Sequence, residues 1–278
     1  NFDARGGSVA SIETTLLEEG SYSNEVDGIV FAGGSTMGLA ATDGVRKRIF
    51  DVRARQATEF DFIPSVPGAV VFDYGGRIHP KMDRYAYPDS KLGEKLMDNL
   101  SSDTFLVGRT GAGLNVTSSK ISQPIWGGQG FKYLEFNGGI KIIVATVVNS
   151  GGNIILPDGK MLNQDLKSER NPDHDKISHL KPKPGQNTTL SIVITNVPLD
   201  RNALKRLSVM VHTSMAAVIR PFHTPTDGDI LFAVSVPDNK LRASVDETGL
   251  ALAASEMMAE AIIDAGRTSN MKKKSVKL

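Results

Sequence analysis

The sequence predicts a single layered domain of the α+β class that spans residues 1–278. Short runs of β-branched and apolar residues are mixed along the chain with segments whose apolar residues recur every three or four positions. Glycine-rich turns separate most of these segments, and no internal repeat is present. Such a mixed order of strands and helices favours layers packed around a core, which a chain of this length can fill.

Two strands and two helices are expected in the first hundred or so residues. Residues 26–32 and 68–74 are apolar runs bounded by turn residues, a pattern typical of buried strands. The glycine-rich turn at 33–38 leads into a predicted helix over residues 39–50. Residues 90–100 have the pattern of a helix with a polar face.

The middle of the chain combines a strong strand signal with a polar connection. Residues 140–148 have the clearest strand pattern of the chain and follow a glycine-rich loop at 107–113. Residues 157–186 are polar, charged and poor in apolar side chains, so we expect a mobile surface connection. It leads into another strand-like run at 190–196.

Two amphipathic helices and one strand are expected in the last third. Asp200 and Asp246 are placed to act as N-caps. The apolar residues that follow each cap lie along one helix face, and they are Leu204, Leu207, Val211, Met215 and Val218 for the first helix and Leu250, Ala254, Met257 and Ala261 for the second. Pro221 should end the first helix, residues 230–236 should form a strand, and the basic residues 271–277 should be a frayed, solvated tail.

The composition argues against several functional classes. A net charge of +1 gives no electrostatic case for binding nucleic acid or an acidic membrane surface. The absence of cysteine excludes thiol catalysis, disulfides and cysteine metal sites. No apolar run approaches the roughly 18 residues of a membrane span. Residues 1–7 lack an initiator Met and a signal-peptide profile, which indicates a trimmed or partial chain and leaves the compartment open, with a slight preference for the cytoplasm.

The segment Asn187-Thr188-Thr189 suggests a nucleophile. It joins a polar Pro/Gly loop to the apolar run at 190–196, so a loop brings Thr188 to the start of a buried strand. A threonine hydroxyl needs a base, and cleavage of the Asn187–Thr188 bond would supply one as the freed α-amine of Thr188. An exposed loop and an N-glycosylation sequon are the alternative interpretations of the same residues.

The turn at residues 33–38 allows a different function. It has the strand–turn–helix context of a nucleophile elbow, but Met37 occupies the position of the last glycine of that motif. It also resembles a dinucleotide-binding turn in which Ser35 replaces the middle glycine. A tight packing turn between a strand and a helix is the commoner explanation.

Four polar residues elsewhere are candidate site residues. Asp227 and Asp229 flank Gly228, so they either form a capping turn or a carboxylate pair that holds the ammonium and hydroxyl groups of a nucleophile. Lys120 follows the glycine loop and would need burial, and a lowered pKa, to be catalytic rather than a surface lysine. Asn149 ends the strand at 140–148, where its amide either closes the strand or donates to an oxyanion.

The histidines do not predict a metal site. His79, His174, His179, His212 and His223 show no ligand spacing. Local hydrogen bonding is therefore expected of His212 and His223, and no metal or cofactor is predicted.

Several segments, taken in chain order, carry a family resemblance. They are Asp3-Ala4-Arg5-Gly6-Gly7, residues 32–34 with Gly38 and Leu39, residues 108–113 with Lys120, Asn149, residues 187–197, residues 211–215, residues 221–224, residues 227–229 and residues 231–234. Together they resemble the DmpA-type family of self-processing aminopeptidases, especially its nylon-oligomer hydrolase branch. The resemblance extends over nearly the whole chain and is strongest at residues 187–197.

The resemblance implies a fold, a maturation step and a set of roles. The implied fold is a four-layer αββα sandwich, and the implied maturation is autocatalytic cleavage into fragments 1–187 and 188–278 that stay together. Thr188 would be the nucleophile and Asn149 an oxyanion donor, while Lys120, Asp227 and Asp229 would orient and assist Thr188. The family also suggests a homotetramer.

These implications favour an amide hydrolase. The main expectation is an aminopeptidase or amidase that acts on short peptides or peptide-like amides, with no nucleic-acid or membrane partner. An endo-acting hydrolase of 6-aminohexanoate oligomers is the alternative within the same chemistry. A non-catalytic, nucleotide-binding α/β protein that uses the turn at 33–38 is the alternative from another class.

The chain departs from the family pattern at two places. Many relatives carry a tyrosine near the nucleophile where this chain has Phe72, so a phenolic donor is missing there unless Tyr74 replaces it. Family chains also usually have upstream residues that form the first strands, and without these the sheet edge would be incomplete.

Overall fold

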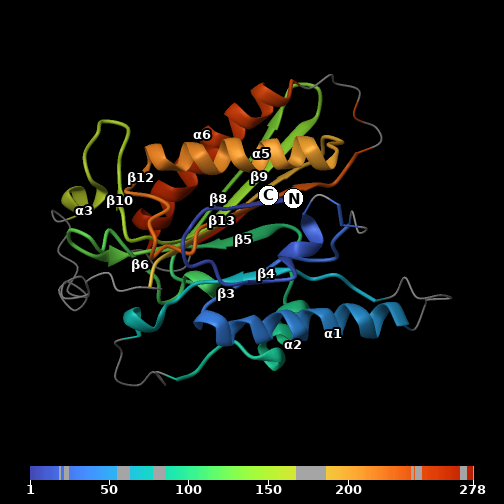
Figure 1. Ribbon diagram of the computed structural model, residues 1–278. Coiled ribbons are helices and arrows are strands. Elements are labelled where there is room, and N and C mark those ends of the chain that lie inside the picture. Colours follow the sequence, from blue (N-terminus) through green and yellow to red (C-terminus); the bar gives the residue numbers. More distant parts are fainter. Residues whose placement is uncertain are drawn as a thin grey trace.

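The computed structural model of the chain has four stacked layers in the order helix, sheet, sheet, helix (Figure 1). Helices α5 (Arg201–Ser214) and α6 (Glu247–Thr268) cover one face of the paired sheets, and α1 (Ala40–Ala54) and α2 (Ser90–Asp98) cover the other. The structure describes residues 1–18, 20–21, 25–54, 63–77, 85–166, 186–238, 241, 246–269 and 274–277. The layer order confirms the expected αββα sandwich of the α+β class.

The larger sheet contains five strands in the order β1–β13–β11–β9–β8. Their bounds are β1 (Phe2–Ala4), β13 (Ile230–Ser235), β11 (Thr188–Thr195), β9 (Ile140–Asn149) and β8 (Gly128–Phe136). Strand β11 runs parallel to β13 and antiparallel to β9. The start of β11, the start of β13 and the end of β9 therefore meet at one end of the sheet.

The smaller sheet has the order β2–β4–β3, with bounds β2 (Ser11–Ile12), β4 (Gly68–Val70) and β3 (Val30–Ala32). The strands expected at 26–32 and 68–74 are in place but shorter than predicted. After β4 the Val71 N–H still donates to Ala32 O, and the chain then leaves the sheet, where the carbonyl of Phe72 accepts from the Asn149 side chain. The 3₁₀-helix η2 (Ser35–Leu39) precedes α1, and α2 confirms the predicted helix at 90–100.

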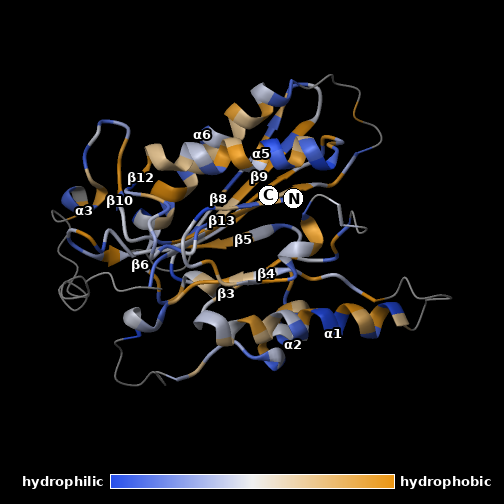
Figure 2. Cartoon of the chain, viewed as in Figure 1, coloured by the Kyte–Doolittle hydropathy of each residue, from blue (hydrophilic) through white to orange (hydrophobic). Residues whose placement is uncertain are grey.

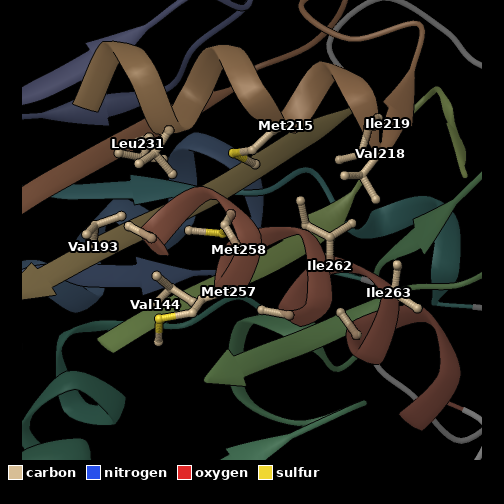
Figure 3. Close-up of a cluster of buried hydrophobic side chains, with 14 of the residues drawn as sticks. Val144, Val193, Met215, Val218, Ile219, Leu231, Met257, Met258, Ile262 and Ile263 are labelled. Carbon is tan, nitrogen blue, oxygen red and sulfur yellow. The ribbon is translucent and has the colours of Figure 1, made fainter. Parts of the chain in front are cut away.

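Apolar residues fill all three spaces between the layers. The largest core lies between the five-stranded sheet and the α5–α6 layer, where Val144, Val193 and Leu231 of the strands meet Met258 and Ile262 of α6 (Figure 3). A second cluster lies between the two sheets and a third between the smaller sheet and α1. Figure 2 shows that α6 is more hydrophobic than α1 or α5, in agreement with the many buried residues along its length.

The two predicted N-caps are confirmed. The Asp200 carboxylate accepts the N–H of Ala203 at 2.8 Å, and the Asp246 carboxylate accepts the N–H of Gly249 at 2.9 Å. Each cap satisfies an N–H group that has no partner within its helix. Helix α5 ends earlier than predicted, at Ser214, and a 3₁₀ turn, η7 (Met215–Ala217), replaces its expected last turn before the short strand β12 (Ile219–Arg220).

Two expectations of unstructured segments need correction. The short helix α3 (Leu162–Asp165) lies within the predicted mobile connection because Leu162 and Leu166 are buried in the core against α6, while residues 167–185 of that connection lie outside the described residues. Strand β14 (Lys274–Lys277) lies in the predicted frayed tail and pairs with β5 (Thr104–Val107). The apolar Val276, which packs with a cluster that contains Val107, explains why this basic segment is held on the domain.

The remaining elements are short. They are η1 (Thr14–Leu17), η4 (Tyr74–Gly76), η5 (Gly111–Gly113), β6 (Thr117–Ser118), β7 (Ile125–Trp126) and β10 (Asn153–Ile154). Within the described ranges, none of the helices combines the length and the apolar character needed to cross a lipid bilayer.

Candidate active site

The predicted nucleophile stands where three strand ends of the larger sheet meet. Thr188 is the first residue of β11 and pairs with Asn149, the last residue of β9. Leu190 lies two residues after Thr188 in β11, and Val147 lies two residues before Asn149 in β9. Both are buried between the two sheets. Because side chains alternate along a strand, Thr188 and Asn149 also face the space between the sheets. Both are almost completely buried.

The Thr188 hydroxyl lies against the peptide bond that precedes it. It donates to the carbonyl oxygen of Asn187 at 2.5 Å. The N–H of Gly228 donates to the same oxygen at 2.8 Å. Two donors thus converge on the carbonyl of the bond predicted to be cut. The glycosylation reading is disfavoured, because Asn187 is 1% exposed and its side chain is held by two partners.

The amine of Lys120 binds the residues upstream of this bond and the end of β9. Its Nζ donates to Gln186 O at 2.8 Å and to Asn187 Oδ1 at 3.1 Å, upstream of the predicted cleavage point. It also donates to the backbone oxygen and the Oδ1 of Asn149, at 2.9 and 3.0 Å. The lysine therefore fixes the last residues of the predicted large fragment against the end of β9.

The electrostatic setting of Lys120 is that of a buried amine rather than a surface lysine. Burial lowers its pKa from 10.5 to about 7, although the charges of Asp227 and Asp229 favour the ammonium form. Burial also raises the pKa of Asp227, and the neighbouring charge of Asp229 adds to the rise. Perturbed groups of opposite type in one place are a common property of catalytic sites.

Asn149 binds its neighbours through both ends of its amide. Its Nδ2 donates to Phe72 O at 2.9 Å and to Gln186 O at 3.1 Å, and its Oδ1 accepts the N–H of Thr117 at 3.1 Å. In the uncleaved chain the amide thus contacts the carbonyl one residue upstream of Asn187. A cavity of about 20 Å³, room for a water molecule, adjoins it and is lined by Phe72, Gly75, Gly76, Thr117, Lys120, Asn149 and Gln186.

The two aspartates have different partners. Asp229 accepts the N–H of Thr189 at 2.7 Å through Oδ1, and its Oδ2 binds both the N–H and the Nδ1 of His223, each at 3.1 Å. Asp227 accepts the N–H of Thr224 at 2.7 Å through Oδ2. Its buried Oδ1 has no hydrogen-bond partner among the residues that the structure describes.

The N-terminal motif supports the turn that carries these aspartates. The N–H groups of Arg5 and Gly6 donate to Asp229 O, and the N–H of Ser8 donates to Asp227 O at 2.8 Å. A Cβ on Gly6 would lie 2.3 Å from Asp227 O, so only glycine allows this approach. The segment at 3–7 thus positions the turn rather than contacting Thr188.

The histidines link the turn to helix α5. His223 binds Asp229 as a local hydrogen bond, as predicted, but His212 does not bond locally, because its Nδ1 pairs at 2.9 Å with the distant Asp3. The two imidazole rings meet edge to face, with centroids 4.3 Å apart. Burial lowers the pKa of His212. The described residues contain no cluster of metal-binding side chains, and His79, His174 and His179 lie outside them.

The glycine turn at 33–38 is a packing turn. Its Gly34 N–H donates to the Asp73 carboxylate at 2.9 Å, so this N–H is already engaged and does not face an open phosphate site. A Cβ on Gly38 would lie 1.8 Å from Gly33 O, so close packing accounts for the glycine. The Tyr74 hydroxyl donates to Gly34 O at 3.3 Å and is thereby engaged with this turn, while Phe72 lines the cavity without a polar group on its ring.

Three residues that contribute to the candidate site were not identified from the sequence. The role of Gly228 depends on its N–H, while Gly151 and Thr226 enclose the Asn187 side chain. For Gly228 the flanking aspartates were a signal of a turn, but neither its backbone direction nor the other two contacts can be read from a pattern of residue types.

Comparison with known proteins agrees with this arrangement. The sequence pattern of the family described as "Peptidase family S58" matches residues 1–273. The chain belongs to peptidase family S58. This is the DmpA family, so the predicted resemblance is confirmed, and the chain is a hydrolase of peptide or amide bonds.

Relatives within family S58 carry two kinds of name. An uncharacterized aminopeptidase of Mycobacterium tuberculosis is 31% identical over 84% of this chain and 68% of its own. A 6-aminohexanoate-oligomer endohydrolase of Paenarthrobacter ureafaciens is 32% identical over 95% of this chain and 76% of its own. The solved L-aminopeptidase D-Ala-esterase/amidase of Ochrobactrum anthropi, a variant of the Ntn-hydrolase fold, aligns with a TM-score of 0.68 at 21% identity, covering 95% of this chain and 71% of that one.

Closing the space at Gly228 should slow the self-cleavage that the sequence predicts at Asn187–Thr188. A Cβ there would lie 2.6 Å from Thr188 Oγ1 and 2.9 Å from Ser8 O. Because the hydroxyl must turn from the carbonyl oxygen towards its carbon, we expect Gly228→Ala to reduce the cleavage rate by about 100-fold or more, the effect of misplacing a reacting group. The measurement is the time course of fragment formation. Gly28→Ala is the matched control, since the nearest atom to its Cβ is 3.8 Å away and cleavage should keep the parental rate.

Proposed function

We propose that the chain cuts itself between Asn187 and Thr188 and then acts as an N-terminal-threonine amide hydrolase. The observation that carries the proposal is the buried contact between the Thr188 hydroxyl and the Asn187 carbonyl, at 2.5 Å. The Gly228 N–H on the same oxygen, at 2.8 Å, supports it, because a donor there would stabilise the charge that develops during attack.

The self-cleavage step is an N-to-O acyl shift followed by hydrolysis. Thr188 Oγ1 bonds to the carbonyl carbon of Asn187, the carbon–nitrogen bond between the two residues breaks, and the hydroxyl proton passes to the released nitrogen. Water then hydrolyses the resulting ester, which leaves a carboxylate on Asn187 and a free α-amine on Thr188. The fragments 1–187 and 188–278 stay associated through the pairing of β11 with β9 and of β1 with β13.

Turnover reuses the same groups. The α-amine of Thr188 accepts its hydroxyl proton, which makes the residue its own base. The Gly228 N–H, which donates to Asn187 O in the uncleaved chain, holds the oxyanion, and Lys120 keeps the acyl side in place. The family resemblance adds Asn149 as a second oxyanion donor, although its Nδ2 donates to Gln186 O in the uncleaved chain. Asp227 has one buried oxygen without a partner among the described residues, which suits an acceptor for the new α-ammonium. Asp229 fixes the start of strand β11 through the Thr189 N–H. The reaction needs no cofactor or metal.

The substrate class we propose is a short peptide or a peptide-like amide, cleaved by an aminopeptidase or amidase activity. An endo-acting activity on 6-aminohexanoate oligomers is the second candidate. The chain's own geometry supports it, because Gln186 lies on the acyl side of the Asn187–Thr188 bond and its carbonyl is bound there by Lys120 and Asn149. We further propose a homotetramer of processed protomers.

A substrate panel tests this proposal. The processed protein is assayed with amino-acid p-nitroanilides, β-amino amides and 6-aminohexanoate oligomers, and we expect release of amine from at least one class. The Thr188→Ala variant, assayed at equal concentration, should release none. If the parent is processed but hydrolyses no member of the panel, the proposed amide hydrolase activity is wrong although the self-cleavage is right.

A further inference from the structure

In the uncleaved chain, Asn187 occupies the position that the acyl residue of a substrate would occupy in the mature enzyme, and Gln186 precedes it. Self-cleavage and turnover use one nucleophile, and the carbonyl attacked in the first reaction belongs to Asn187. The surroundings of the Asn187 side chain therefore describe the acyl subsite of the mature enzyme. This step rests on the proposed function.

The Asn187 side chain is held at both ends of its amide. Its Oδ1 accepts from Lys120 Nζ at 3.1 Å, and its Nδ2 donates to the hydroxyl of Thr226 at 3.1 Å. The residue is 1% exposed, so these contacts replace water rather than compete with it. One partner is a donor only and the other accepts, which matches the two ends of a carboxamide.

Gly151 provides the space for the Asn187 amide. A Cβ on that residue would lie 2.9 Å from Asn187 Nδ2 and 3.2 Å from its Cγ, so the amide fits because residue 151 has no side chain. A leucine side chain at the Asn187 position has the same branching at Cγ and would place apolar carbons where the amide makes its hydrogen bonds. It would also leave Lys120 without one of its acceptors and Thr226 without the Nδ2 donor, so that the Thr226 hydroxyl would keep only its contact with the Thr224 hydroxyl.

We propose that this pocket is a specificity subsite for an acyl residue with a carboxamide one carbon from Cα, so that asparaginyl amides are the preferred substrates. Lys120 and Thr226 recognise the amide, and Gly151 leaves room for it. After cleavage, the Asn187 residue of the large fragment leaves this pocket and a substrate residue of the same shape takes its place.

The first test compares substrates. Asparaginyl and leucyl p-nitroanilides are each assayed with a free amine and with an acetyl-glutaminyl group, so that the comparison holds for exo and endo action. In whichever of the two forms the enzyme hydrolyses, we expect kcat/KM to be about 30-fold or more higher for the asparaginyl than for the leucyl substrate. This is the effect expected when a leucyl side chain leaves the buried polar groups of the pocket unpaired. The free peptide Lys-Pro-Gly-Gln-Asn, which repeats residues 183–187, should inhibit competitively, and its Lys-Pro-Gly-Gln-Leu analogue should not.

The second test uses the chain as its own substrate. Asn187→Leu should slow self-cleavage by about 30-fold or more, and Asn187→Asp, which keeps the length and the acceptor, should slow it much less. Thr226→Val keeps the shape of the side chain and should lower the asparaginyl-to-leucyl ratio of kcat/KM about tenfold. Thr213→Val, which removes a hydroxyl bound to Val209 O on α5, should leave that ratio at the parental value.

The outcomes separate the two proposals. A processed enzyme that hydrolyses amides with an asparaginyl-to-leucyl ratio near one overturns the subsite and leaves the proposed function standing. A parent that is neither processed nor active on any amide overturns the proposed function, and the subsite with it. A high ratio that Thr226→Val lowers and Thr213→Val does not supports the subsite.

Discussion

Denaturing electrophoresis of the purified parent should show two fragments, residues 1–187 and 188–278, and the Thr188→Ala variant should remain a single chain. The variant lacks the hydroxyl that lies 2.5 Å from the Asn187 carbonyl, and no other hydroxyl is found on that oxygen among the described residues. Intact mass and the N-terminal sequence of the smaller fragment, which should begin Thr-Thr-Leu-Ser, identify the bond that is cut. The expected effect is complete, because without the hydroxyl there is no nucleophile for the shift.

Two further variants test whether the cleavage depends on Thr188 Oγ1 itself. Thr188→Ser keeps a hydroxyl at the same place and should still be processed. Thr189→Val removes the neighbouring buried hydroxyl, while the N–H that binds Asp229 at 2.7 Å is retained, so processing should continue. Cleavage of Thr188→Ala at the same bond would show that another group or another protease performs the cut.

The layered fold could be predicted from the sequence because its main elements have strong local patterns. The strand at β9 and the helix at α6 each carry a clear apolar periodicity, and Asp200 and Asp246 mark helix starts. The predictions of secondary structure were wrong where contacts between distant parts of the chain determine the structure. Strand β14 forms because Val276 packs with Phe105, a contact between residues far apart in a segment of otherwise basic composition.

The sequence allowed five candidate site residues to be chosen, but it did not predict the contacts between them. Thr188, Asn149, Lys120, Asp227 and Asp229 do come together, and their assembly depends on the register that places Thr188 opposite Asn149. Register is set by packing over the whole sheet, which no local pattern states. For the same reason the backbone N–H of Gly228 could not be found from residue types.

Self-cleavage should slow as pH rises through about 7. Burial lowers the pKa of Lys120 to about 7, so its amine is cationic below that pH and neutral above it. The cationic form is the stronger donor to Gln186 O and to Asn187 Oδ1, and these contacts hold the acyl side in place. The test follows fragment formation after cell-free synthesis across a pH series that spans neutrality.

Substitutions at Lys120 test whether the cationic or the neutral amine promotes self-cleavage. Lys120→Met keeps the chain length and removes the donor, and we expect a loss of about 100-fold or more. Lys120→Arg stays cationic, so the residual cleavage should show no fall near pH 7. Lys95→Met on α2 is the control for loss of an exposed lysine. A rate that rises through pH 7 in the parent, and no longer does so in Lys120→Met, would make Lys120 the proton acceptor instead.

The same burial predicts a pH-dependent stability, which can be measured on uncleaved Thr188→Ala. Above pH 10.5 the amine of Lys120 is neutral in both the folded and unfolded states and contributes nothing. Between about 7 and 10.5 the unfolded state binds a proton that the folded state does not, so the free energy of unfolding should rise with pH by about 1.4 kcal/mol per unit from this group. Below 7 both states are protonated, and the full cost of burying the ammonium is present. Adding Lys120→Met should remove this slope, because a change in packing shifts stability equally at every pH and only the loss of a titrating group changes the slope.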